Sequence, residues 1–188
     1  MRRFRLLTLS GVIAHVPKPK RRGECTTLEC AAFGLAMLGL SAVLRPIPRL
    51  VWNASASAPT GLYGVVSHAP ITRGELVLAK LPLAARTLAA ARDYLPAGTP
   101  IAKHVAALAG DTVCSRGRVI TINGHPVAKR LLADTRGRKL PAWHGCQTLR
   151  RGQVFLLNAA VPDSFDSRYF GPVTRRAIIG RLVAIWTR

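Results

Sequence analysis

Two serines and one lysine carry the chemistry that this sequence offers. Ser55 and Ser57 lie one residue apart in the segment Asn53–Tyr63, which reads NASASAPTGLY. A serine hydroxyl is a weak nucleophile until a neighbouring base takes its proton, and that base is usually a histidine. The chain has five histidines, and none of them lies in a recognisable motif of a catalytic triad. A lysine can take the place of the histidine if burial lowers its pKa towards neutrality.

Lys103 meets the requirement for such a base. It lies in the apolar segment PIAKHVAAL, and strand alternation places its side chain on the same face as Ile101 and Val105. The amine would then emerge from an apolar surface, where its charged form is disfavoured. The alternative is a strand lysine that extends to solvent, which is the commoner fate of this residue type. Spacing alone leaves both interpretations open.

One apolar segment near the N-terminus predicts a membrane anchor. Cys30–Leu44 carries no charge, and the run RPIPR follows it as a linker. As a helix the segment spans about 22 Å, so that a crossing needs the neighbouring residues as well. A buried helix and the core of a signal peptide are the alternatives. We predict a basic arm at residues 1–25, a transmembrane anchor at residues 26–44 and a folded domain at residues 45–188.

Basic residues flank this apolar segment unevenly. Seven lysines and arginines precede it, whereas Arg45 and Arg49 stand just after it. The positive-inside bias then predicts a single-pass protein of a bacterial inner membrane, with a cytoplasmic N-terminus and a periplasmic domain. Cys114 and Cys146 fall in that domain, where an oxidising compartment favours a disulfide between them. Two buried thiols are the alternative.

The charge balance is strongly basic. The net charge is +20, from 28 basic and 8 acidic residues spread through the chain. No helix-turn-helix, zinc-ligand or RNP-like motif accompanies the arginines, and aromatic residues make up only 6% of the chain, which leaves few stacking platforms. We therefore expect no nucleic-acid partner; the basic surface reflects overall composition or lies against anionic lipid. The chain has no CxxC or HxxxH spacing, and we expect neither a metal nor a cofactor.

The domain has the pattern of a mainly β protein. Asn123-Gly124 separates two apolar runs within Arg118–Leu131, which predicts a β-hairpin. One helix is predicted at Leu83–Leu95, rich in Ala and Leu and ended by Pro96. Further strands are predicted at Gly74–Lys80, at Thr99–Leu108, in QVFLLNAAV and in AIIGRLVAIW. The prediction is a mainly antiparallel β domain with one short inserted helix.

Three blocks, in this order, resemble the type I signal peptidase family of Ser/Lys membrane peptidases. They are Ser57–Thr60, Lys103–Asp111 and Asp163–Pro172, and the closing Ile179–Trp186 resembles the same family. The short Ser-x-Pro-x-Gly-Leu-Tyr form and the compact chain resemble the TraF-type branch, the maturation peptidases of conjugative transfer. Cys114 after Gly-Asp-Thr-Val resembles that branch as well, and NAAVP stands at Asn158–Pro162 where the family has GDNRD.

The resemblance implies a role for each matching residue. Ser57 would be the nucleophile and Lys103 its general base, while the Ser55 hydroxyl and the Ser57 backbone N–H would bind the oxyanion. Ser164 matches a serine that bonds the lysine amine. Asp166 and Arg168 match a structural ion pair near the site. For Ser55 and Ser164, a plain hydroxyl without a catalytic role is the alternative.

The function that the resemblance implies is a membrane-anchored serine endopeptidase with a signal-peptidase-like fold. Peptidases of the TraF-type branch cleave a pilin precursor and can join its ends into a ring. The implied partners are the precursor protein, membrane lipid and other proteins of a transfer apparatus. A general signal peptidase acting on exported preproteins is one alternative, which the compact chain and the missing GDNRD disfavour. A non-catalytic, membrane-anchored basic component of the apparatus is the other.

Overall fold

The computed structural model describes residues 27–43, 49–55 and 58–188. The predicted N-terminal arm at residues 1–25 and the predicted nucleophile Ser57 lie outside these residues. The chain divides into two units, residues 1–46 and residues 47–188.

The first unit contains helix α1 (Thr27–Val43). This helix falls within the residues predicted as an anchor, and its sequence TLECAAFGLAMLGLSAV carries one charge, Glu29, in the first turn. Within the described parts of the chain, no helix is both long and apolar enough to cross a membrane.

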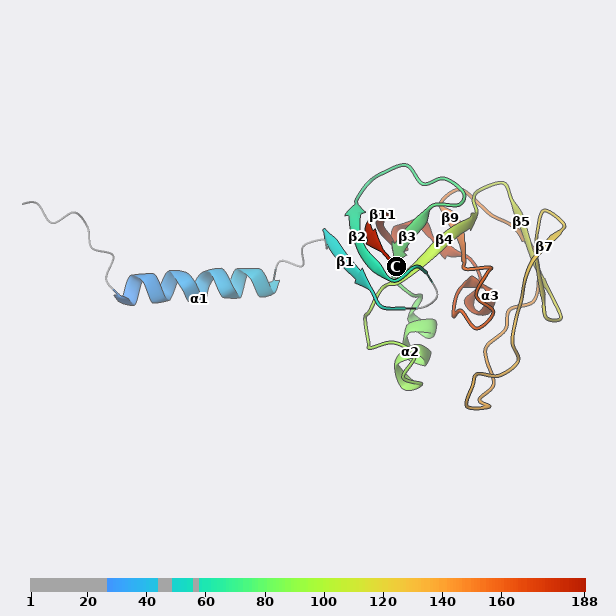
Figure 1. Cartoon of the computed structure of the whole chain (residues 1–188), viewed down its shortest axis with the longest axis horizontal. Coiled ribbons are helices and arrows are strands. Elements are labelled where there is room, and N and C mark those ends of the chain that lie inside the picture. The colour runs from blue at the N-terminus through green and yellow to red at the C-terminus, as the bar shows by residue number, and fades with distance from the viewer. Residues whose placement is uncertain (1–26, 44–48, 56–57) are drawn as a thin grey trace, which may run out of the picture. The chain divides into compact units, whose positions relative to one another are not determined.

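Two antiparallel sheets form the second unit (Figure 1). The larger sheet has the strand order β1-β2-β11-β3-β4-β9-β10, and the smaller has the order β7-β6-β5-β8. The strands of the larger sheet are β1 (Leu50–Asn53), β2 (Gly61–Val66), β3 (Leu76–Ala79), β4 (Ile101–Ala107), β9 (Gln153–Leu157), β10 (Val173–Thr174) and β11 (Ile178–Thr187). Those of the smaller sheet are β5 (Thr112–Arg116), β6 (Val119–Ile122), β7 (His125–Lys129) and β8 (Gly145–Thr148). The prediction of a mainly antiparallel β domain is confirmed.

The predicted hairpin is strands β6 and β7. Asn123 and Gly124 form its turn with φ angles of 51° and 83°. Two consecutive positive φ values give the turn that matches the twist of a tight hairpin, and Asn-Gly tolerates them best. The Asn123-Gly124 dipeptide therefore predicted the position of this turn correctly.

The inserted helix is shorter than predicted. Helix α2 covers Leu83–Ala91, whereas the sequence predicts a helix as far as Leu95. The chain reverses at Asp93, which has a φ of 58°, and the Tyr94 N–H bonds back to the Ala89 carbonyl oxygen at 2.9 Å. Tyr94 then packs edge-on against Phe165. Tertiary packing thus ends the helix before Pro96 does. Two short helical segments follow later in the chain, α3 (Ser167–Phe170) and the 3-10 helix η1 (Arg175–Ala177).

Strand β4 lies inside the larger sheet, between β3 and β9 (Figure 1). Its residues alternate between buried and half-buried along the whole strand. Val105 belongs to a core cluster with Val77, Ala79, Val154 and Leu156, which come from the two neighbouring strands. A side chain on this face of β4 is therefore surrounded by apolar groups.

Gly61 begins β2 at the point where three strands meet. It pairs with Asn53 of β1 on one side and with Thr187 of β11 on the other. A Cβ atom at Gly61 would strike the Trp186 carbonyl oxygen and lie 2.8 Å from the Thr187 Cα. Both contacts are with backbone atoms, which cannot move aside as a flexible side chain can.

We expect Gly61→Ala to lower the free energy of unfolding by about 1–3 kcal/mol, because β2 must move away from β11. Gly64→Ala on the same strand is the matched control, since a Cβ there would meet Ile185 Cδ1 at an ordinary 3.6 Å. Urea unfolding of the two variants checks the prediction. Equal stability of the two variants would contradict it.

Candidate active site

Lys103 lies in the middle of the larger sheet, on β4. It pairs with Val77 of β3 across the ladder. Its side chain shares a face with the buried residues Ile101 and Val105, and Lys103 itself is only 3% exposed. The interpretation of Lys103 as a lysine that extends to solvent is therefore wrong.

Burial lowers the pKa of the Lys103 amine from its ordinary 10.5 to about 8. The main cause is that the ammonium form loses its hydration inside the protein. The negative charges of Asp166 and Asp163 act in the opposite direction and raise this pKa, while Arg168 lowers it. Near pH 8 about half of the molecules thus hold a neutral amine, the form that can accept a proton from a hydroxyl.

The amine of Lys103 is hydrogen-bonded to a buried serine. Lys103 Nζ donates to Ser164 Oγ at 2.8 Å, and Ser164 is also 3% exposed. The Ser164 N–H bonds to the Val161 carbonyl oxygen at 3.2 Å, which fixes the serine on the loop after β9. The contact between Lys103 and Ser164 is the one that the family resemblance implies.

A fully buried ion pair holds this loop in place. The Arg168 guanidinium contacts both carboxylate oxygens of Asp166, with distances of 2.8 and 3.0 Å. It also donates to the backbone carbonyl oxygens of Asn158 at 2.8 Å, Pro162 at 2.9 Å and Lys129 at 3.4 Å. Asp166 caps α3 by accepting from the Arg168 N–H at 3.1 Å. One charge pair thus joins the loop after β9 to the start of α3 and to the end of β7.

Asn158 extends the pairing of β4 beyond the end of β9. Its Oδ1 accepts from the His104 backbone N–H at 3.0 Å, and its Nδ2 donates to the Ala102 carbonyl oxygen at 3.3 Å. The His104 Nδ1 lies 3.0 Å from the same Oδ1 and must carry the hydrogen, because an amide oxygen only accepts. Asn158 therefore binds the residues on both sides of Lys103 and fixes the backbone from which the amine extends.

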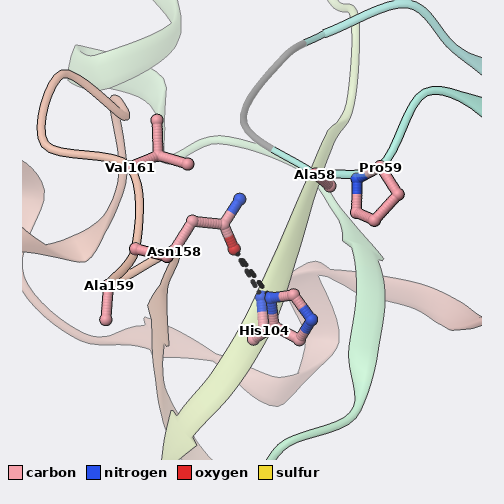
Figure 2. A pocket seen from close by; sticks show the side chains of 7 residues that line it. Ala58, Pro59, His104, Asn158, Ala159 and Val161 are labelled. Atoms are coloured by element: carbon pink, nitrogen blue, oxygen red, sulfur yellow. Dashed lines mark hydrogen bonds between the residues drawn. The ribbon is translucent and has the colours of Figure 1, made fainter. Parts of the chain in front are cut away.

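A pocket of about 210 Å³ opens beside these residues (Figure 2). The His104 ring and the Asn158 amide meet on one side of it, and Figure 2 shows Ala58 and Pro59 of the β1–β2 loop at another part of its wall. The lining residues are Ala58, Pro59, His104, Asn158, Ala159, Ala160 and Val161. Three parts of the chain thus line the pocket: Ala58, which follows Ser57; His104, which follows Lys103; and the loop after β9.

The predicted oxyanion residues are described only in part. Ser55 is exposed, and its backbone is held by Asn53, since the Ser55 N–H donates to Asn53 Oδ1 at 3.1 Å. Ser57 is outside the described residues, but Ala58 directly after it is buried. The roles of Ser55 and Ser57 in binding an oxyanion stay predictions.

Cys114 and Cys146 form a disulfide in the smaller sheet. They are directly paired on β5 and β8, so the bond links two neighbouring strands. Neither residue lines the pocket. The disulfide belongs to the framework of the smaller sheet.

Two asparagines with a part in this site were not identified from the sequence as site residues. Asn158 lies in the segment where the family pattern is lost, and nothing in NAAVP marks its side chain as a bridge to β4. Asn53 carries a weak signal, because Asn two residues before a serine often bonds the backbone ahead of it. Both act through their amides on backbone groups that only the folded chain brings near.

Comparison with known proteins identifies the family. The family model described as "Signal peptidase, peptidase S26" matches residues 23–187. The chain belongs to this family, which supports a serine-type peptidase. It is 34% identical over 172 residues to the probable conjugal transfer protein TraF of Sinorhizobium fredii, covering 86% of this chain and 89% of that one. It is also 34% identical over 175 residues to the plasmid transfer protein TraF of Escherichia coli, covering 85% and 98%. A crystal structure of a signal peptidase I from Enterococcus faecalis matches 63% of this chain and all of its own, with 23% identity and a TM-score of 0.36.

We expect Arg168→Met to lower the free energy of unfolding by about 3–5 kcal/mol, because it leaves the buried Asp166 carboxylate without its partner. Arg136→Met is the matched control, since Arg136 and Asp93 form an exposed pair at 3.6 Å and their separation should change stability little. Urea unfolding measures both effects. Similar losses in the two variants would contradict a structural role for the buried pair.

Proposed function

We propose that this protein is a membrane-anchored serine endopeptidase of a conjugative transfer system, in which Ser57 and Lys103 act as a catalytic pair on a pilin precursor. The observation that carries the proposal is the buried Lys103 amine, which donates to Ser164 and has a pKa near 8. A lysine in this state is suited to the work of a general base. The relatives named as conjugal and plasmid transfer proteins support the biological setting.

The proposed reaction has two stages. Ser57 Oγ attacks the carbonyl carbon of the scissile peptide bond while its proton passes to the neutral Lys103 Nζ. The Ser55 hydroxyl and the Ser57 N–H bind the oxygen anion of the tetrahedral intermediate. The carbon–nitrogen bond then breaks, and the leaving amine takes the proton from Lys103. This leaves an ester between Ser57 and the N-terminal part of the substrate.

The second stage releases this ester. Lys103, neutral again, removes a proton from the attacking group as the ester carbonyl is attacked. Attack by water gives a linear product with a new carboxylate. Attack by the amine at the other end of the same bound segment gives a cyclic product instead, with a peptide bond in place of the ester. In both cases the Ser57 hydroxyl is restored.

Ser164 has a positioning role in this proposal. As the acceptor of the bond from Lys103 it directs the amine while leaving it uncharged, because a hydroxyl adds no net charge to the site. The Asp166–Arg168 pair has a similar role at longer range. It holds the loop of Ser164, and its two charges shift the pKa of Lys103 in opposite directions.

The catalytic pair predicts a clear result for three variants. We expect Ser57→Ala to lower kcat by at least about 10⁴-fold, because the proposed nucleophile is removed. We expect Lys103→Met, which keeps the length of the side chain without the amine, to lower it by roughly 10²–10⁴-fold. Lys80→Met is the control, since Lys80 is exposed.

The intact mass of a co-expressed pilin precursor is the measurement. Wild type should give the cleaved product, and a mass lower by one further water would indicate a ring. Unprocessed precursor is expected with the first two variants. Full processing by Ser57→Ala would favour the non-catalytic alternative, and equal processing of unrelated exported preproteins would favour the general signal peptidase.

The pH dependence of the same reaction tests Lys103 further. Because the neutral amine is the active form, kcat/KM should rise with pH through about 8 and then level off. Asp163 is exposed and its charge raises the pKa of Lys103, so Asp163→Asn should move this rise to lower pH. A rise centred on the ordinary lysine pKa of 10.5, or a flat profile, would contradict the assignment.

For the location of the protein we propose a single-pass inner-membrane protein with a periplasmic domain. The uneven basic flanks of the apolar segment and the disulfide between Cys114 and Cys146 support this orientation. Helix α1 has 17 residues, so a crossing would also use residues next to it.

We expect the chain to stay with membranes after an alkaline wash and its domain to be digested by protease added to spheroplasts. Release by the wash, or protection of the domain, would contradict the proposal.

A further inference from the structure

The loop between β1 and β2 is closed at its base by a backbone pair and filled by one side chain. Asn53 pairs with Gly61 in the strand ladder, and the residues between them include Ser57. The Asn53 side chain bonds to this loop, and the residue is only 7% exposed. It is thus a buried polar group whose side-chain hydrogen bonds, among the described residues, all go to the segment from Ser55 to Pro59.

The amide of Asn53 bonds to backbone groups on both sides of Ser57. Before it, Asn53 Oδ1 accepts from the Ser55 N–H and Nδ2 donates to the Ser55 carbonyl oxygen, both at 3.1 Å. After it, Nδ2 donates to the carbonyl oxygens of Ala58 and Pro59, both at 3.0 Å. The Tyr63 hydroxyl adds a bond of 2.7 Å to the same Pro59 oxygen.

These contacts require a neutral amide. Three carbonyl oxygens face Nδ2, and one N–H faces Oδ1, so the opposite orientation would set oxygen against oxygen and hydrogen against hydrogen. A carboxylate at this position would repel the three carbonyl oxygens, and an apolar side chain of the same shape would donate to none of them. Only the Pro59 oxygen would then keep a side-chain donor, the Tyr63 hydroxyl. Only a side chain with a donor and an acceptor on one short, branched end fits.

These bonds are not needed for the strands themselves. The ladder of β1 and β2 is formed by backbone groups from the pair Leu50–Gly64 to the pair Asn53–Gly61. The side chain of Asn53 adds nothing to that ladder and acts on the loop alone. The effect of losing it should therefore appear in the loop and in the reaction, rather than in the sheet.

We propose that Asn53 is a positioning residue that holds the nucleophile loop by binding the backbone on both sides of Ser57. The inference rests on the proposed function for its catalytic part. A reacting group that is displaced by about 1 Å can lose two orders of magnitude in rate. Asn53 thus acts on the reaction through the placement of the serine, without touching the substrate.

The test compares two variants of the full chain. In Asn53→Leu the amide is replaced by an apolar group of similar shape, and in Asn53→Asp the donor is replaced by an oxygen. We expect both to lower kcat for precursor cleavage by roughly 100-fold at pH 8 with little change in KM. Hydrogen–deuterium exchange of residues 54–58 should become about tenfold faster in Asn53→Leu, because the Ser55 N–H loses its acceptor. The turn at Asn123-Gly124 is the internal control and should exchange as in wild type.

The pH dependence separates this role from a general loss of structure. A carboxyl group that faces carbonyl oxygens has a raised pKa, and once protonated it regains one donor. The kcat of Asn53→Asp relative to wild type should therefore rise as the pH falls from about 8 to about 5, whereas the ratio for Asn53→Leu should stay constant.

Tyr63→Phe, which removes only the hydroxyl bonded to Pro59, gives a second and milder variant if the Asn53 variants do not fold. It should speed up exchange in the same residues.

Three results would overturn the inference. The first is exchange in residues 54–58 that is unchanged in Asn53→Leu and in Tyr63→Phe. The second is faster exchange with an unchanged kcat, and the third is the same pH-independent loss for both Asn53 variants. Activity that persists in Ser57→Ala and Lys103→Met would instead overturn the proposed function and the catalytic part of the inference with it. The exchange data would then still decide whether Asn53 holds the loop.

Discussion

The buried ion pair between Asp166 and Arg168 is the interaction on which the rest of the site depends. Two charges without exposure to water are stable only if nearly all of their hydrogen-bonding groups find partners. Here the partners are the backbone of Asn158, the carbonyl oxygens of Pro162 and Lys129, and the first turn of α3. The pair therefore fixes the course of the segment that carries Ser164. Any movement of that segment would leave a buried charge partly unsatisfied.

The same pair also acts on the pKa of Lys103. A carboxylate near a buried amine favours the ammonium form and raises its pKa, whereas a guanidinium lowers it. Asp166 and Arg168 have these opposite effects on Lys103, and burial is the larger influence. The Lys103 amine therefore has a lowered pKa, and the Asp166–Arg168 pair holds the loop that fixes its position. The lowered pKa of Lys103 thus comes mainly from its burial in the sheet, and the loop with the ion pair fixes the position of the amine.

Much of this arrangement could be predicted from the sequence, because it depends on local patterns. Asn123-Gly124 located a hairpin turn, since few residues accept two positive φ angles in a row. The alternation around Lys103 placed its side chain on the buried face of β4, but only the family resemblance favoured the buried alternative over solvent. The resemblance of the block from Asp163 to Pro172 to the family also identified Ser164 and the Asp166–Arg168 pair as residues of the site.

The remaining features depend on contacts between distant segments. Helix α2 ends before its helix-forming sequence does, because Tyr94 turns away to pack on Phe165 about 70 residues further along. Asn158 reaches the backbone of β4, more than 50 positions earlier in the chain. Asn53 acts within a short segment, yet its role follows from the burial that the folded sheets provide. Spacing in the sequence carries little information on contacts of this kind.

The groups that hold the site have one chemical property in common. Asn53 and Asn158 fix the two backbone segments that lead to Ser57 and Lys103, and both do so with neutral amides. Ser164 holds the amine itself with a neutral hydroxyl. A carboxylate in the place of Ser164 or Asn158 would offer stronger hydrogen bonds to N–H groups, but its charge would raise the pKa of Lys103 and reduce the neutral fraction near pH 8. A site whose base is a buried lysine therefore favours neutral positioning groups, and its two buried charges, Asp166 and Arg168, are present as a pair.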